Sequence, residues 1–181
     1  IKSYKETLKF LLARLVYNDA LITIFAFGGI YAKEVFNFTF NEIFLFGIVL
    51  NIAAGIGAFV LGFLDDILGG KKTIQISNFG FIVACLLAVL APSFESGKLI
   101  FWVSGGLIGV FSGPNQAASR SLMGRLTPIN KENEFYGFFA FSGKATAFMG
   151  PLLLGLLTQI FESQRYGIAV VILFLIVGFL L

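Results

Sequence analysis

The sequence predicts an all-helical protein that crosses a membrane six times. Hydrophobic residues make up 57% of the 181 residues, charged residues only 13%, and the mean hydropathy is +0.91. A soluble domain carries about 25% charged residues. Apolar stretches of roughly 20 residues, the length that a helix needs to cross a bilayer core, recur along the chain. The expected spans are 8–32, 41–64, 73–92, 98–122, 134–161 and 165–181.

Basic residues fall mainly in alternate loops, which predicts the orientation of the chain. Eight lie before or just inside the first span, or in or at the edge of the second–third and fourth–fifth loops: Lys2, Lys5, Lys9, Lys71, Lys72, Arg120, Arg125 and Lys131. The other side holds only Lys33, Lys98 and Arg165. Because lysine and arginine favour the cytoplasmic face, we expect the start of this chain to be cytoplasmic.

Several classes of function are disfavoured by what the sequence lacks. It has no histidine, so histidine-dependent catalytic dyads and histidine metal sites are excluded. Cys85 is the single cysteine and has no internal disulfide partner. We therefore expect no enzyme activity, cofactor or metal, although a membrane-embedded site built on aspartates alone stays open. The basic residues flank the spans without forming a stripe, which excludes nucleic acid as a partner.

The first span, 8–32, is basic before it is apolar, but its apolar part is too long for a secretory signal. Arg14, Asn18 and Asp19 lie inside it. Charged groups at membrane depth are costly and usually face a partner or a water-filled path. Arg14 alternatively extends to the headgroups, whereas Asp19, roughly 16 Å from the cytosolic end at about 1.5 Å per residue, is too short to do so. We predict that all three residues belong to a translocation path.

The second and third spans, 41–64 and 73–92, are joined by the best motif in the sequence, at residues 62–72. Gly62 permits close packing of helices, while Gly69 and the next glycine permit a tight turn. Asp66 suits a positively polarised helix N-terminus. The lysines that follow, Lys71 and Lys72, suit the anionic headgroup layer. An ordinary short loop with cytoplasmic lysines is the alternative interpretation.

The spacing of Gly62, Leu64, Asp66, Gly69 and Lys71–Lys72 resembles the loop signature of the major facilitator superfamily. Ile67 and Gly70 depart from that signature, because basic residues are usual there. The signature lies between the second and third helices of each six-helix half. The resemblance therefore implies that residues 1–181 form one half of a twelve-helix transporter.

Three further stretches resemble the C-terminal half of the Atg22-like branch, which includes the vacuolar amino-acid effluxer of fungi. They are Phe10–Asp19, Gly113–Ser121 and Glu134–Lys144. The chain starts at Ile1 and stops within an apolar run, so we expect it to be a piece of a longer protein. The resemblance implies that amino acids or another small polar solute are the cargo.

The fourth span, 98–122, combines a packing face with polar groups. Gly105, Gly109 and Gly113 recur every four residues, which suits close contact with another helix. Pro114 is expected to open the helix beside Asn115 and Gln116. In the family that the chain resembles, the first and fourth helices line the central cavity. We therefore expect Asn115 and Gln116 to form a polar wall opposite the first span, with a purely structural interhelical contact as the alternative.

The fifth span, 134–161, contains Lys144 and the Gly150–Pro151 pair, and the sixth, 165–181, is an uninterrupted apolar run after Arg165. Lys144 lies at about the same depth as Asp19, and the first and fifth helices are neighbours in the family that the chain resembles. A charge pair is therefore expected, serving either as a gate or substrate contact or only to neutralise two charges. Gly150–Pro151 predicts a bend, with or without a role in transport.

These observations predict a secondary transporter that works by alternating access. The expected partners are the lipid bilayer, a missing N-terminal six-helix half and a small-molecule substrate, with proton coupling as one driving force. The membrane is expected to be the plasma or inner membrane in a bacterium and the vacuolar membrane in a fungus. A stand-alone six-helix channel or carrier acting as a homo-oligomer is the alternative.

Overall fold

The computed structural model describes residues 4–181, and Lys2, one of the basic residues assigned to the cytoplasmic side, lies outside them. Within this range every regular element is a helix, which confirms the all-helical prediction. The elements are α1 (Lys5–Phe36), α2 (Phe40–Leu68), α3 (Gly70–Leu90), the 3₁₀ helix η2 (Ala91–Ser93), α4 (Gly97–Leu126), α5 (Glu132–Ser142), α6 (Met149–Phe161) and α7 (Gln164–Leu180).

Within residues 4–181, three segments are long and apolar enough to cross a membrane: Lys5–Phe36, Phe40–Leu68 and Gly70–Ser93. The helices α6 and α7 are apolar but shorter. Helix α4 has 30 residues, yet it contains five glycines in its first 17 residues and a polar C-terminal part. The number of six crossings therefore stays a prediction.

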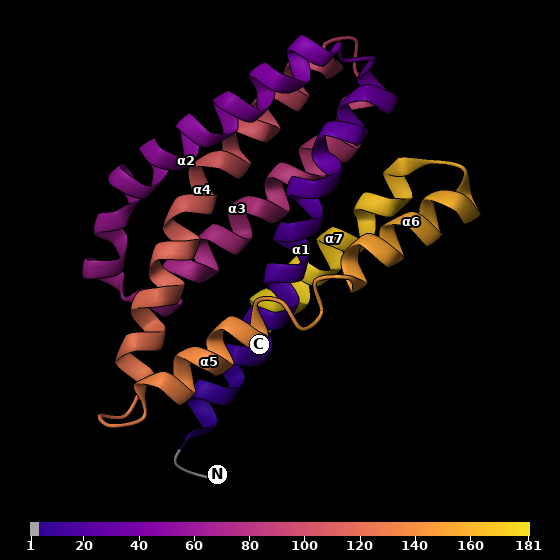
Figure 1. Ribbon diagram of the computed structural model, residues 1–181. Helices are drawn as coiled ribbons and strands as arrows, with labels where there is room; N and C mark the ends of the chain where they lie inside the picture. The colour runs from indigo at the N-terminus through magenta and orange to yellow at the C-terminus, as the bar shows by residue number, and fades with distance from the viewer. Residues whose placement is uncertain (1–3) are drawn as a thin grey trace.

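Helix α4 forms the centre of one side of the bundle, where both α2 and α3 pack against it (Figure 1). Helix α7 packs against α1, α3 and α6. The core between these groups contains large side chains that are fully buried, among them Tyr17, Phe81, Met123 and Leu175. The first, third, fourth and last helices thus share one core.

The glycines of α4 allow α2 to approach it closely, as the sequence predicted. A Cβ atom on Gly109 would lie 2.6 Å from the carbonyl oxygen of Leu50 and 2.7 Å from the Cβ of Ala53. A Cβ on Gly113 would lie 2.8 Å from the Cβ of Ala58. Neither position has space for a side chain, so backbone contact holds this pair of helices together.

Pro114 does not open α4, which contradicts the expectation from the sequence. The helix continues from Gly97 to Leu126 with the proline inside it. Proline has no amide hydrogen for the carbonyl four residues earlier, which is that of Val110. That carbonyl faces Gly57 of α2, in a contact so close that no Cβ would fit. The close packing of α2 against this turn restricts bending of α4, and the helix continues through the proline.

The fifth predicted span is two helices rather than one, and this is the main departure from the predicted elements (Figure 1). Residues 143–148 form successive turns between α5 and α6, with short-range bonds such as Met149 N to Thr146 O at 2.7 Å. Pro151 cannot donate to a carbonyl of this segment, but it fits the first turn of α6, where amides have no helical partner. The chain thus breaks before the Gly150–Pro151 pair, where a bend was predicted, and that pair lies in the first turn of α6.

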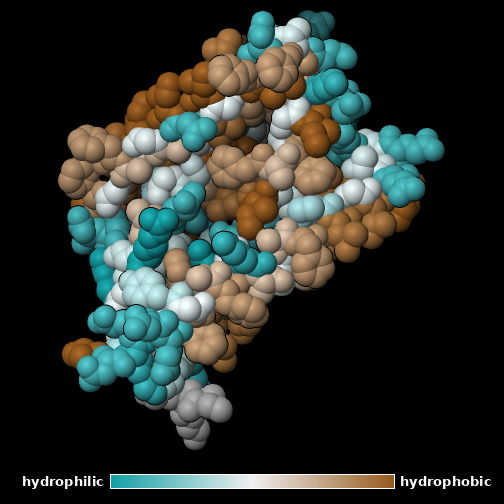
Figure 2. All heavy atoms as spheres, in the orientation of Figure 1, coloured by the Kyte–Doolittle hydropathy of each residue, from teal (hydrophilic) through white to brown (hydrophobic). Residues whose placement is uncertain are grey.

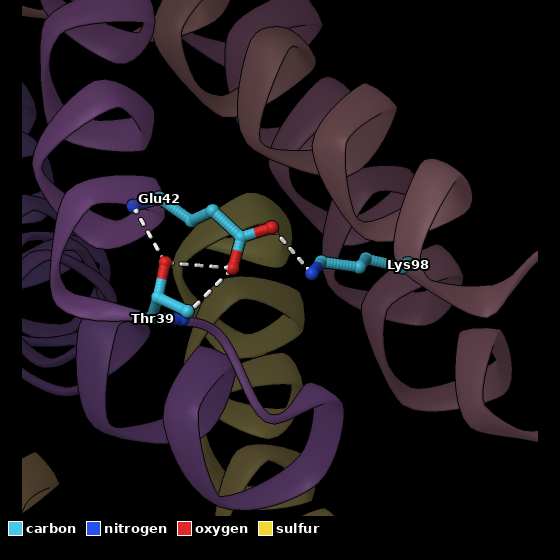
Figure 3. A network of polar contacts seen from close by, with 3 residues as sticks. All are labelled: Thr39, Glu42 and Lys98. Carbon is cyan, nitrogen blue, oxygen red and sulfur yellow. Dashed lines mark hydrogen bonds and ion pairs between the residues drawn. The ribbon is translucent and has the colours of Figure 1, made fainter.

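Helices α2 and α4 are also joined where both begin (Figure 3). The Glu42 carboxylate accepts hydrogen bonds from the Thr39 amide at 2.8 Å and the Thr39 hydroxyl at 3.0 Å, and it forms an ion pair with Lys98. In return the Thr39 hydroxyl accepts from the Glu42 amide at 3.3 Å. This capping box ends the loop after α1 and fixes the start of α2.

One face of α2 remains uncovered and strongly apolar. Its exposed side chains are Phe44, Ile48, Ile52, Ile56, Phe59, Val60 and Phe63. Figure 2 shows hydrophobic side chains along the flank that α2 forms in Figure 1. A continuous apolar surface of this size suits lipid or another helical unit better than water.

We predict that Gly109→Ala destabilises the bundle, because the new Cβ overlaps the backbone of α2. The expected loss is about 1–3 kcal/mol, seen as a lower thermal midpoint in detergent. Gly106→Ala is the matched control, because a Cβ on Gly106 meets nothing within 4 Å. Equal midpoints for the two variants would contradict this packing.

Candidate functional site

Polar side chains of α1 hold the end of α5 and the segment that follows it. Arg14 Nη1 donates to the carbonyl of Phe139 at 2.8 Å and to the Ser142 hydroxyl at 3.2 Å. Its guanidinium also lies over the Phe139 ring, 3.7 Å from the centroid. One turn later Asn18 Nδ2 donates to the carbonyl of Gly143 at 2.7 Å. These residues therefore supply donors to carbonyls at the C-terminus of α5, where helical partners run out.

Asp19 holds the other side of the interruption. Its side chain is buried, and Oδ2 accepts a hydrogen bond from the amide of Gly150 at 3.0 Å. Gly150 lies in the first turn of α6, where free amides and the helix dipole favour a carboxylate. The second oxygen, Oδ1, has no hydrogen-bond partner among residues 4–181. Asp19 thus acts as a cap supplied by another helix.

The expected pair between Asp19 and Lys144 is not formed. Lys144 is exposed, and the ion pairs within residues 4–181 involve other residues. The expectation rested on a continuous fifth helix, whereas Lys144 lies in the turns between α5 and α6. The depth of Lys144 cannot be counted at a constant rise per residue across that interruption. The Asp19 carboxylate instead accepts a hydrogen bond from the Gly150 amide of α6.

Four of the predicted site residues line one cavity of about 330 Å³. They are Arg14 and Asn18 of α1 and Asn115 and Gln116 of α4. The structure thus brings Asn18 and the α4 amides to one cavity, as expected. Figure 2 shows hydrophilic side chains on the face where α1, α4 and α5 meet in Figure 1. We call this space the α1–α4 cavity.

Behind this cavity lies a buried polar network that sequence reasoning missed in part. Asn115 Nδ2 donates to Asn78 Oδ1 on α3 at 3.2 Å. The Ser119 hydroxyl donates to the Asn115 carbonyl at 2.6 Å and bonds the Tyr17 hydroxyl at 2.8 Å. Asn115 therefore has a structural contact between helices. Gln116, which is exposed and has no side-chain hydrogen bond within residues 4–181, is free to meet a solute.

Tyr17 and Asn78 had detectable signals in the sequence. Tyr17 follows Arg14 by three residues and so shares its helix face. Asn78 is an amide within an otherwise apolar predicted span. Neither residue is charged, so pattern alone did not single them out, although Tyr17 lies within the Phe10–Asp19 stretch that carries the family resemblance.

The loop motif is placed between α2 and α3 as predicted, but its residues act differently. Gly69 has a φ of +83°, a conformation that favours glycine, and it makes the turn. Gly62 does not mediate packing, because a Cβ there would meet nothing within 4 Å. Lys71 and Lys72 are exposed, as headgroup contacts require.

The acidic residue that contacts other helices is Asp65 rather than Asp66. Asp65 Oδ2 pairs with Arg125 of α4 at 3.4 Å, and a Cβ on Gly70 would lie 3.1 Å from Asp65 Oδ1. Asp66 is exposed and has no ion-pair partner within residues 4–181. Adjacent residues of a helix lie about 100° apart around its axis, and only Asp65 faces the start of α3.

We predict that Asp19→Ala lowers the thermal midpoint in detergent, because it leaves the Gly150 amide unpaired in a buried site. The cost of such an orphaned donor is about 1–3 kcal/mol. Asp19→Asn keeps an oxygen that accepts this bond and should recover most of the loss. An unchanged midpoint for the alanine variant would contradict the capping role.

Comparison with known proteins shows which protein family this chain resembles. A model of the family described as "Vacuole effluxer Atg22 like" matches residues 1–181. The chain is 26% identical over 178 residues to YxiO of Bacillus subtilis, named as an uncharacterized MFS-type transporter, covering 98% of this chain and 40% of that protein.

Fungal proteins show the same degree of similarity. The autophagy-related protein 22 of Kluyveromyces lactis is 26% identical over 184 residues, covering 96% of this chain and 37% of that protein. The protein of the same name from Cryptococcus neoformans is also 26% identical, over 181 residues, covering 93% and 33%. This chain thus spans about a third to two fifths of the relatives that it matches. It belongs to the family of vacuole effluxer Atg22-like proteins.

Proposed function

We propose that this chain is one six-span half of a secondary transporter that moves a small polar solute by alternating access. The family assignment and the similarity to a protein named as an MFS-type transporter support a transport function. The apolar helices and the uncovered apolar face of α2 support a multi-pass membrane protein. The other half, which would complete the cavity, is the proposed partner.

The observation that carries this proposal is the α1–α4 cavity. Helices α1 and α4 direct Arg14, Asn18 and Gln116 to one space of about 330 Å³. Polar groups at membrane depth are costly, so their convergence suits a water-filled path for a solute. Amino acids are the cargo that family similarity supports. The basic residues near the start of the chain favour a cytoplasmic N-terminus.

Asp19 is our candidate for proton coupling. It is buried in α1, its Oδ1 has no hydrogen-bond partner within residues 4–181, and no cation pairs with it there. A carboxylate in this position can gain and lose a proton at low structural cost, since Oδ2 alone makes the bond to α6.

We predict that Gln116→Ala lowers exchange of the transported solute by about tenfold, because one hydrogen bond to the solute is lost. The measurement is counterflow in proteoliposomes containing the full-length protein, with a panel of amino acids. Asn51→Ala is the matched control, because Asn51 does not line the α1–α4 cavity and, within residues 4–181, bonds to the Gly47 carbonyl of its own helix. Wild-type exchange by Gln116→Ala would remove this residue from the path, and leakage without counterflow would favour a channel.

The same vesicles test proton coupling through Asp19. We predict that Asp19→Asn retains counterflow exchange but loses accumulation of solute driven by a pH gradient, because the amide cannot take up a proton. Wild-type accumulation by Asp19→Asn would place the coupling group elsewhere. Glu95→Gln, at an exposed carboxylate in the turn before α4, serves as the control.

A further inference from the structure

We propose that the α1–α4 cavity binds a carboxylate group of its solute between Arg14 and Arg120. This inference rests on the proposed function for its setting and adds the charge that the site selects. Arg14 of α1 and Arg120 of α4 both line the cavity. No aspartate or glutamate lines it. The cavity therefore carries two guanidinium groups and no built-in counter-charge.

The contacts of Arg14 leave part of its guanidinium available. Nη1 donates to both the Phe139 carbonyl and the Ser142 hydroxyl, whereas Nη2 and Nε have no hydrogen-bond partner within residues 4–181. The Phe139 ring supports the flat guanidinium from one side. Gly143 leaves the space that it occupies, since a Cβ there would lie 2.6 Å from Nη1. Arg14 is therefore held in place with donors to spare.

Neither arginine is neutralised by the protein. The ion pairs within residues 4–181 are Lys9–Glu6, Lys98–Glu42 and Arg125–Asp65. Asp19, the carboxylate nearest in sequence to Arg14 on α1, is directed to the Gly150 amide and does not line the cavity. Arg14 is half-buried and Arg120 is exposed, and neither has an ion-pair partner within residues 4–181. Two such guanidinium groups attract an anion, and their planar donors match the two oxygens of a carboxylate.

The other residues that line the cavity indicate what the rest of the solute must be like. Leu21, Ile22 and Phe25 supply an apolar wall, and Gln116 supplies a free amide. A cavity of about 330 Å³ lies at the lower end of the range for small-molecule sites. The class of ligand is thus a small organic solute with one carboxylate and a short hydrocarbon part.

Isovalerate and isovaleramide are suitable probes, because they share one shape and differ in charge. Their binding to the full-length protein is measured by the shift in thermal midpoint, in nanodiscs of zwitterionic lipid at constant ionic strength. We expect isovalerate but not isovaleramide to raise the midpoint. Arg120→Gln should weaken the apparent affinity for isovalerate by about tenfold or more, as expected for a lost charge-assisted hydrogen bond.

Arg125→Gln is the matched control, since Arg125 lies on the same helix but pairs with Asp65 outside the cavity. It should bind isovalerate like the wild type. Equal binding of the two probes, or wild-type affinity in Arg120→Gln, would overturn the proposal. An Arg120-dependent shift produced by phosphatidylglycerol but not by isovalerate would assign the anion to a lipid headgroup and also overturn it.

The binding assay separates this inference from the proposed transport. Arg120-dependent binding of isovalerate without counterflow would retain the carboxylate site and overturn the transporter. Counterflow that accepts carboxamides as readily as acids would retain the transporter and overturn the carboxylate site.

Discussion

The cost of a buried backbone group without a hydrogen-bond partner is the constraint on which the rest of this structure depends. A helix that ends inside the bundle must find other partners for its last carbonyls, and one that begins there must find them for its first amides. Here α1 provides them, with Asn18 at the Gly143 carbonyl and Asp19 at the Gly150 amide. The polar residues of α1 therefore have a structural use before they have a functional one.

The same contacts shape the α1–α4 cavity. The Arg14 guanidinium packs over the ring of Phe139 on α5, and both residues line the cavity. The position of the guanidinium therefore depends on the position of α5. On the other wall, Asn115 is held by Asn78 and Ser119, while its neighbour Gln116 is left free. The two adjacent amides of α4 thus have different roles: Asn115 links α3 to α4, and Gln116 faces the cavity.

The sequence was informative where a residue contrasts with its surroundings. Arg14, Asn18 and Gln116 stand out in apolar spans, and the four-residue spacing of Gly105, Gly109 and Gly113 predicted the contact face of α4. Predictions that depended on tertiary packing failed. The sequence does not show that Gly57 of α2 packs against Val110, one turn before Pro114. The expected opening of α4 at the proline was therefore wrong. The Asp19–Lys144 pair required an uninterrupted helix, and which of Asp65 and Asp66 faces α3 required the register of the turn.

The interruption between α5 and α6 divides the fifth span into parts with different neighbours. Helix α5 packs against α1 and α4, which line the cavity, whereas α6 packs mainly against α7. A continuous rod would carry a displacement at one end along its whole length. Two short rods joined by turns do not pass it on directly, so the contacts that both make with α1 become the link between the cavity lining and α7.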